Sequence, residues 1–236
     1  MKNFIFGLLI LVILITYNDN KSWAKEDPIE KLKKATETDP KDYAPHFSLG
    51  QEYHAMGIYE KAIEEYKKTI ELEPLFAAAF KGLGASYGEL GDFDKAVEAY
   101  LEATHLGPNY AEAQYGLGWS YFQLKEYDKA LLPLKIAVKI EPKMVAAHFT
   151  LGKVWAMLDE HRSAINEYQN TLAITPISPD VHFYLGQSFT SMNMHNQAVK
   201  AYNDTLRLSP NYFEAYMGIG KAYISSGKNN EAIPPL

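Results

Sequence analysis

The sequence predicts an all-α protein built from stacked helical hairpins, and three observations support this. A glycine recurs every 34 residues, at Gly50, Gly84, Gly118, Gly152, Gly186 and Gly220. The same residue types surround each glycine in one register, without insertion or deletion. No segment shows the sustained alternation of apolar and polar residues that indicates a half-buried strand. A fixed period of this length is typical of an elongated array in which each hairpin is stabilised by its neighbours.

The residues around the glycine predict two helices in each unit. In residues 43–76 the apolar positions are spaced by three, four and seven, first over 43–56 and then over 59–72, as in amphipathic helices. Gly57 stands between them, where a left-handed C-cap is expected. Pro74 ends the second helix because proline cannot continue it. Each unit is therefore predicted as helix A, a tight turn, helix B and a second tight turn.

Small residues mark the surface on which helices A and B meet. Gly50 on helix A and Ala62 on helix B allow the two backbones to approach closely, and tyrosines such as Tyr66 then fill the space toward the next hairpin. One such hairpin cannot bury its apolar face alone, so neighbouring units must stack.

This pattern resembles the tetratricopeptide repeat family, whose signature carries Leu-Gly and Tyr on helix A, then Ala, an aromatic residue and Pro, at these offsets. The first repeat shows them as Leu49, Gly50, Tyr53, Ala62, Tyr66 and Pro74. The resemblance covers residues 43–236 and implies a right-handed α-solenoid with a concave groove lined by the A helices. It divides the chain into repeats at 43–76, 77–110, 111–144, 145–178 and 179–212, and a partial one at 213–236. Upstream, residues 25–42 are predicted as a half repeat with a single helix B.

The first 24 residues differ from the rest of the chain. Lys2 precedes an unbroken, mostly aliphatic run from Phe4 to Ile15, and Ser22-Trp23-Ala24 fits a cleavage site between small residues. This order predicts a secretory signal peptide cleaved after Ala24. The alternative is an uncleaved membrane anchor formed by residues 4–17, although the apolar run is shorter than the ~20 residues of a comfortable span. Both alternatives place the repeats outside the cytoplasm, in a periplasmic or similar compartment.

Composition and motifs argue against an enzyme. The net charge is −6 without a basic run, which disfavours nucleic acid as a partner, and the absence of cysteine excludes disulfides and thiol nucleophiles. The segment from Gly218 to Lys221 lacks the preceding glycine of a phosphate-binding loop. His46, His148 and His182 share one column on stacked helices, a ladder that does not converge on a metal. We therefore expect no catalytic residues, no metal and no cofactor.

The family resemblance places binding residues on helix A, at positions that face the groove. The residues at these positions are aromatic, basic or polar and comprise Phe47, Gln51, Lys81, Tyr115, Trp119, Phe122, Phe149, Lys153, Phe183, Gln187 and Lys221. The alternative for the aromatic members is burial between helices. If exposed, they suit a protein or peptide segment that is apolar or aromatic with some acidic character.

Two groove types known in the family are not supported by the sequence. The clamp for a C-terminal carboxylate uses Lys and Asn where this chain begins with Phe47 and Gln51. The asparagine ladder two residues before the glycine is replaced by other residues, namely Ser48, Gly82, Gly116, Thr150, Tyr184 and Gly218.

The function predicted from the sequence is that of a non-catalytic interaction scaffold. Its groove would bind a segment of a partner, or a neighbouring copy, during assembly of an extracytoplasmic complex. Unpaired helix faces at the half repeat and at the last unit make a homo-oligomer possible. The alternative is the substrate-recognition arm of a larger transferase whose catalytic domain lies beyond residue 236.

Overall fold

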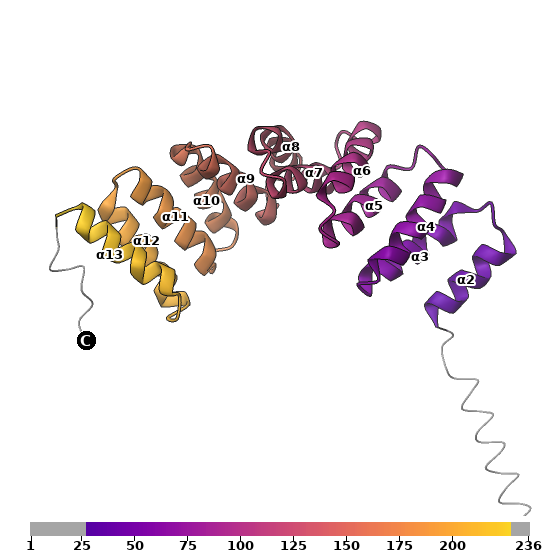
Figure 1. Cartoon of the computed structure of the whole chain (residues 1–236), viewed down its shortest axis with the longest axis horizontal. Coiled ribbons are helices and arrows are strands. Elements are labelled where there is room, and N and C mark those ends of the chain that lie inside the picture. Colours follow the sequence, from indigo (N-terminus) through magenta and orange to yellow (C-terminus); the bar gives the residue numbers. More distant parts are fainter. Residues whose placement is uncertain (1–26, 228–236) are drawn as a thin grey trace, which may run out of the picture. The chain divides into compact units, whose positions relative to one another are not determined.

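The computed structural model describes residues 27–227, and these residues form α-helices and connecting turns without a strand (Figure 1). The fold class predicted from the sequence is thereby confirmed: the protein is all-α, with sequentially paired, stacked helices. The signal peptide or anchor predicted for residues 1–24, and the end of the partial repeat, lie outside the described residues. None of the described helices is both long and apolar enough to cross a membrane.

The described residues fall into two units, one ending at Glu73 and the other beginning at Pro74. The first unit holds three helices, which are α2 (Pro28–Thr38), α3 (Tyr43–Ala55) and α4 (Tyr59–Leu72). In it, α3 packs against α2 and α4. The second unit holds the remaining helices, namely α5 (Ala77–Glu89), α6 (Phe93–Leu106), α7 (Ala111–Gln123), α8 (Tyr127–Ile140), α9 (Val145–Met157), α10 (His161–Ile174), α11 (Pro179–Ser191), α12 (His195–Leu208) and α13 (Phe213–Ser225).

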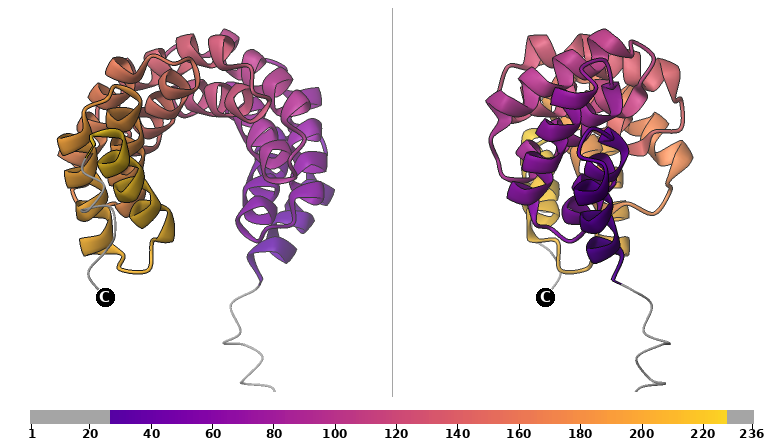
Figure 2. Two further views of the ribbon diagram at one scale, coloured as in Figure 1. Left: turned by 60° about the vertical axis from the view of Figure 1, so that its left-hand side comes forward. Right: turned by 90° about the vertical axis from the view of Figure 1, so that its right-hand side faces the viewer.

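Helix packing in the second unit follows one rule. Each A helix (α5, α7, α9, α11) packs against the B helix that follows it, and each B helix packs against the next A helix. Successive A helices also touch one another, whereas successive B helices in this unit do not. The A helices therefore lie on the inner side of the curved path that the second unit follows in Figure 2.

A left-handed residue closes helix A in every described hairpin. Gly57 has φ +73°, and Gly91 and Gly227 have φ +77°. At the same position three hairpins carry other residues, and Lys125, Asp159 and Asn193 have φ values of 62°, 63° and 57°. In the first hairpin the amide of Ile58 donates to the carbonyl of Tyr53 at 2.8 Å, the long bond of a Schellman motif. The left-handed C-cap predicted at Gly57 is thus confirmed.

The recurring glycine brings helix A onto a large side chain of helix B. A Cβ atom at Gly50 would lie 2.7 Å from Cε1 of Tyr66, and one at Gly152 would lie 2.5 Å from Cε1 of Tyr168. The repeated alanines, such as Ala62, are fully buried at the same contact. The close approach predicted from these small residues is therefore present in the structure.

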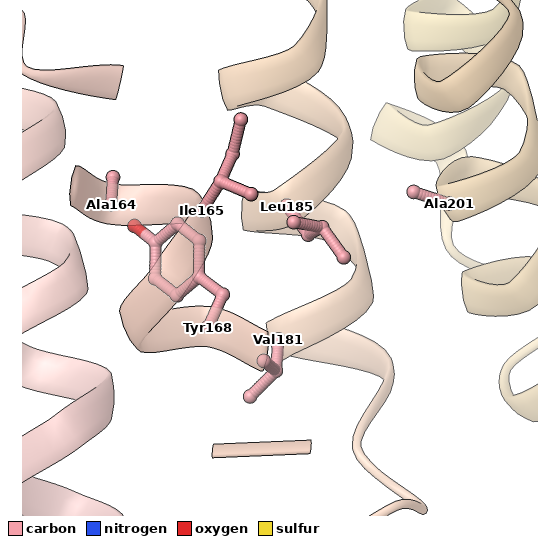
Figure 3. Packing of buried hydrophobic residues seen from close by; sticks show 6 residues of the cluster. All are labelled: Ala164, Ile165, Tyr168, Val181, Leu185 and Ala201. Carbon is pink, nitrogen blue, oxygen red and sulfur yellow. The ribbon is translucent and has the colours of Figure 1, made fainter. Parts of the chain in front are cut away.

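The core is a series of small clusters that join consecutive helices. In the cluster of Figure 3, Ala164, Ile165 and Tyr168 come from α10, while Val181 and Leu185 come from α11. Each cluster joins one hairpin to the next. This is the packing expected of a repeat array, in which stability comes from neighbouring units.

Two of the three histidines in the shared column are buried and paired with glutamates. Nδ1 of His46 lies 2.6 Å from Oε2 of Glu65, and Nδ1 of His148 lies 2.6 Å from Oε2 of Glu167. Nε2 of His148 also lies 3.2 Å from the carbonyl oxygen of Pro142. The histidine–glutamate contacts tie helix A to helix B within one hairpin, and the contact with Pro142 joins helix A to the turn that precedes it.

Candidate functional site

Four aromatic rings from three consecutive A helices surround the ammonium group of Lys153. Its Nζ lies 4.6 Å from the ring centroid of Phe122, 5.6 Å from that of Phe149, and 5.7 Å from those of Trp119 and Tyr184. Trp119 and Phe122 come from α7, Phe149 and Lys153 from α9, and Tyr184 from α11. We call these five residues the lysine–aromatic cluster.

The rings of this cluster also pack on one another. Trp119 and Phe122 are stacked, with centroids 5.7 Å apart, and Phe149 meets the edge of Tyr184 at 5.5 Å. Aromatic pairs in these arrangements are favourable beyond the area that they bury. The rings therefore hold one another in place around the lysine.

Burial is the main influence on the charge of Lys153. Desolvation by its surroundings lowers the pKa of the Lys153 ammonium, and the negative charge of Asp180 opposes this effect. Ring faces attract a cation through their quadrupoles, but they do not replace the hydrogen bonds that water would accept from it. Lys153 is thus a partly dehydrated cation held among aromatic rings.

A hollow of about 560 Å³ opens beside the cluster. We call it the first hollow, and Trp119 is part of both its wall and the lysine–aromatic cluster. Its lining comes from α5, α6 and α7 and includes Lys81, Tyr100, Glu112, Tyr115, Gly116 and Trp119. Burial raises the pKa of both tyrosine hydroxyls, so Tyr100 and Tyr115 are neutral at physiological pH.

A second hollow of about 390 Å³ lies among α11, α12 and α13. Its lining includes Phe183, Gln187, Tyr202, Glu214, Gly218 and Lys221. Several residues match those of the first hollow after three repeat periods, because Tyr202, Glu214 and Gly218 correspond to Tyr100, Glu112 and Gly116. The two hollows are therefore equivalent positions of the repeat.

A glycine two residues before the repeat glycine creates each hollow. A Cβ atom at Gly116 would lie 2.3 Å from Cζ of Tyr100, and one at Gly218 would lie 2.5 Å from Cζ of Tyr202. The tyrosine of the preceding helix B thus forms part of the floor. In the two intervening repeats this position carries Thr150 and Tyr184, and the lysine–aromatic cluster lies there instead.

The predicted groove residues of the second unit fall into three groups. The structure brings together Lys81, Tyr115 and Trp119 at the first hollow. Phe122, Phe149 and Lys153 join Trp119 in the lysine–aromatic cluster. The second hollow gathers Phe183, Gln187 and Lys221.

Some predicted residues have a different environment from the rest. Phe183 is only 9% exposed and packs with Tyr202 and Tyr212 in the core, so it contributes the edge of a buried ring to the second hollow. Phe47 and Gln51 belong to the first unit, where the ring of Phe47 packs against Tyr66 with centroids 6.0 Å apart. Gln51 is exposed there.

The sequence-based prediction missed Tyr184 and the tyrosines beneath the hollows. Tyr184 occupies the column two before the repeat glycine, which is small in the other repeats of the second unit. Its size was the available signal: Tyr184 packs against Tyr168 of the preceding helix B, whereas Gly116 and Gly218 in the same column face Tyr100 and Tyr202. Reading the columns of adjacent repeats as contact pairs would have identified it.

The A helices of the second unit offer aromatic, basic and acidic side chains to a ligand. Within residues 27–227 no cluster of three histidine, aspartate or glutamate side chains is placed to hold a metal ion. The chemistry available on the A helices is therefore recognition by aromatic faces, by lysine ammonium groups and by the carboxylates at the rims of the hollows.

Comparisons with known proteins agree with this architecture. Models described as tetratricopeptide repeat match residues 81–145 and 180–212, and one described as TPR repeat matches residues 50–91. No curated protein matches the sequence significantly.

Solved structures show the same fold. A crystal structure of MamA protein is 31% identical, with a TM-score of 0.64, and the match covers 66% of this chain and 85% of that one. YrrB, described as a TPR protein with an unusual peptide-binding site, is 21% identical with a TM-score of 0.73, covering 80% and 97%. A MamA fragment from Desulfovibrio magneticus RS-1 is 22% identical with a TM-score of 0.67, covering 72% and 96%. The chain belongs to the tetratricopeptide repeat family.

Proposed function

We propose that this protein is a non-catalytic scaffold whose A helices in the second unit bind a segment of a partner protein. The segment is apolar or aromatic with some acidic character. Its binding assembles an extracytoplasmic complex. Tetratricopeptide repeat domains are usually non-catalytic and mediate protein interactions, and the similar protein YrrB is described as having a peptide-binding site.

The observation that carries the proposal is the continuity of the first hollow with the lysine–aromatic cluster. Trp119 lines the hollow on one side and approaches Lys153 on the other. Binding energy in protein interfaces is concentrated in a few residues, with Trp, Tyr and Arg enriched, that seat in well-packed pockets. The first hollow combines aromatic side chains with charged and polar ones, and aromatic side chains with a few placed polar groups are common in binding sites.

Photo-crosslinking in cells tests this surface. A benzoylphenylalanine at Gln123, which lines the first hollow, is expected to capture the partner. The matched control position is Leu132 on α8, helix B of the same hairpin, where the side chain is 68% exposed. Trp119→Ala in the Gln123 background should remove the adduct and leave helicity unchanged. Equal adducts at both positions, or an adduct that persists in Trp119→Ala, would refute the groove.

The mass of the adduct separates two occupants of the groove. An adduct at twice the mass of the chain identifies a neighbouring copy, whereas any other mass identifies a different protein. Both occupants are compatible with a scaffold, and the cross-linked peptide then names the segment.

A reporter fusion tests the proposed compartment. A phosphatase that needs its disulfides, and is therefore active only in an oxidising compartment, is fused after Leu236. Activity is expected with the full chain and is lost when residues 1–24 are removed. Equal activity without residues 1–24 would exclude their role in export. The mass of the isolated chain then distinguishes cleavage after Ala24 from a retained anchor.

A further inference from the structure

Among the described residues Lys153 has no carboxylate partner, and the four rings around its ammonium distinguish it from Lys95 and Lys129, which each lie over one ring. Lys95 pairs with Asp92, and Lys129 pairs with Glu126, each across one helical turn. No such ion pair involves Lys153 in the described part of the chain. Asp180 influences Lys153 at longer range, but one of its carboxylate oxygens already accepts a hydrogen bond from the hydroxyl of Tyr212 at 3.0 Å.

The surroundings of Lys153 would strengthen an incoming carboxylate contact. The ammonium has already lost part of its water to the four rings, so less desolvation remains when a ligand arrives. Charge-assisted hydrogen bonds are also stronger where the local dielectric is low. A carboxylate is thus the group that best completes this site, and a cationic group would be repelled.

The positions of the hollows indicate which kind of carboxylate fits. Lys153 lies on α9, between the A helices that line the first hollow and those that line the second. A segment that uses both hollows runs past Lys153 in both directions. Its carboxylate there comes from an aspartate or glutamate side chain, because a chain terminus would leave one hollow without an occupant.

We propose that Lys153 binds the side-chain carboxylate of an aspartate or glutamate inside the partner segment, while a bulky apolar residue next to it enters the first hollow against Trp119. This inference rests on the proposed function and names the recognition feature of the same surface.

Selection from a random peptide library tests the proposal. Peptides displayed inside a surface loop, with both ends tethered, are selected on the purified chain. Sequences enriched on the unsubstituted protein are expected to carry an aspartate or glutamate beside a bulky apolar residue. Lys153→Met should remove the acidic preference, and Lys153→Arg should keep it. The matched control is Lys135→Met. Lys135 also lies over a ring, that of Trp155 at 4.5 Å, but Lys135 belongs to a B helix.

A double-mutant cycle on one selected peptide measures the contact between Lys153 and the acidic residue of the peptide. It combines a change in the protein with a change in the peptide. Changing the acidic residue of the peptide to its amide should weaken binding to the unsubstituted chain about tenfold or more. The same change should have an effect of about twofold or less on Lys153→Met, because its partner is already absent. Calorimetric titration supplies the four affinities.

The outcomes separate this inference from the proposed function. Peptides that need Trp119 but carry no acidic residue, or that keep the acidic preference in Lys153→Met, overturn the role of Lys153 and leave the groove standing. A parallel library with free C-termini that alone yields binders overturns the side-chain assignment in favour of a terminal carboxylate. If Trp119→Ala affects no selected peptide, or if nothing is enriched, both proposals fail.

Discussion

Lys153 carries its positive charge in an environment that other groove lysines lack. Lys81 lies over a single ring, that of Tyr110 at 5.5 Å, whereas Lys153 lies near four. The rings of Trp119 and Phe122 exclude water from the ammonium, and burial disfavours the charged form of a lysine. The folded protein therefore holds Lys153 less firmly in its protonated state than water would.

We predict that Lys153 titrates below the ordinary lysine value of about 10.4. Because burial lowers its pKa, Lys153 loses its proton at a lower pH than an isolated lysine in water does. The measurement is a pH titration of ¹³C-dimethylated lysines by NMR, with the Lys153 resonance assigned by its absence in Lys153→Arg. In Trp119→Ala, water regains access and the midpoint should move upward. A midpoint at or above about 10.4 in the unsubstituted chain would contradict the desolvated site.

The residues of the site were only partly predictable because single columns vary while their neighbours compensate. The column one after the repeat glycine carries Ala85, Trp119, Lys153 and Gln187 in successive repeats. Because the residue type changes from repeat to repeat, the column as a whole predicts no common role. The prediction found Trp119 and Lys153 but gave no reason for them to meet. They meet because the A helices α7 and α9 are in contact, and Tyr184 on the next A helix adds a further ring.

At the scale of helices, the sequence was sufficient because its signals are local. The turn at Gly57 needs a left-handed residue and Pro74 stops helix B, so both boundaries follow from backbone chemistry. Lys125 adopts the same conformation without glycine, which shows that the array imposes the turn where the local residue does not favour it.

Two glycines of the A helices should respond oppositely to alanine. A Cβ at Gly118 would lie 2.5 Å from Cγ of Leu134 and 3.3 Å from the carbonyl oxygen of Ala130. Leu134 is fully buried and has no room to move, so Gly118→Ala should destabilise the protein by ~1–3 kcal/mol. A Cβ at Gly88 would meet nothing within 4 Å. Gly88→Ala should stabilise the protein by up to ~1 kcal/mol, because it removes the flexibility of glycine from a helix.

Urea unfolding followed by circular dichroism compares the two variants with the unsubstituted chain. The larger Gly118→Leu substitution should lower the midpoint further than Gly118→Ala. An unchanged midpoint for Gly118→Leu would mean that α7 and α8 do not meet as closely as this packing requires.

At the scale of the whole molecule, the sequence predicts the array but not its division into two units at Glu73 and Pro74. Pro74 is one of five equivalent prolines, and nothing in its local sequence separates it from Pro108 or Pro142. A repeat register places the same residue types at every repeat boundary, so it does not indicate where the chain divides.

Buried tyrosines should make the whole fold sensitive to alkali. Burial raises the pKa of Tyr66 to about 12, and it raises those of Tyr100, Tyr168 and Tyr202 as well. In the unfolded chain these phenols lose their protons near pH 10, so above that pH the folded state binds more protons than the unfolded state. The stability they contribute is therefore complete below about pH 10 and falls as pH rises toward 12. Lys153 acts in the opposite sense, but it is one group against several.

Tyr168→Phe isolates this effect in one side chain. Tyr168 is fully buried, and its hydroxyl has no hydrogen-bond partner in the described structure. Removing that hydroxyl should leave the free energy of unfolding at pH 7 unchanged or raise it by ~1 kcal/mol, because an unsatisfied buried polar group is costly. The loss of stability between about pH 10 and 12 should become smaller, since one titrating phenol has gone. Urea unfolding at several pH values measures both quantities, with the exposed Tyr216→Phe as the matched control. The same alkaline slope in all three proteins would show that ionisation of buried tyrosines does not drive alkaline unfolding.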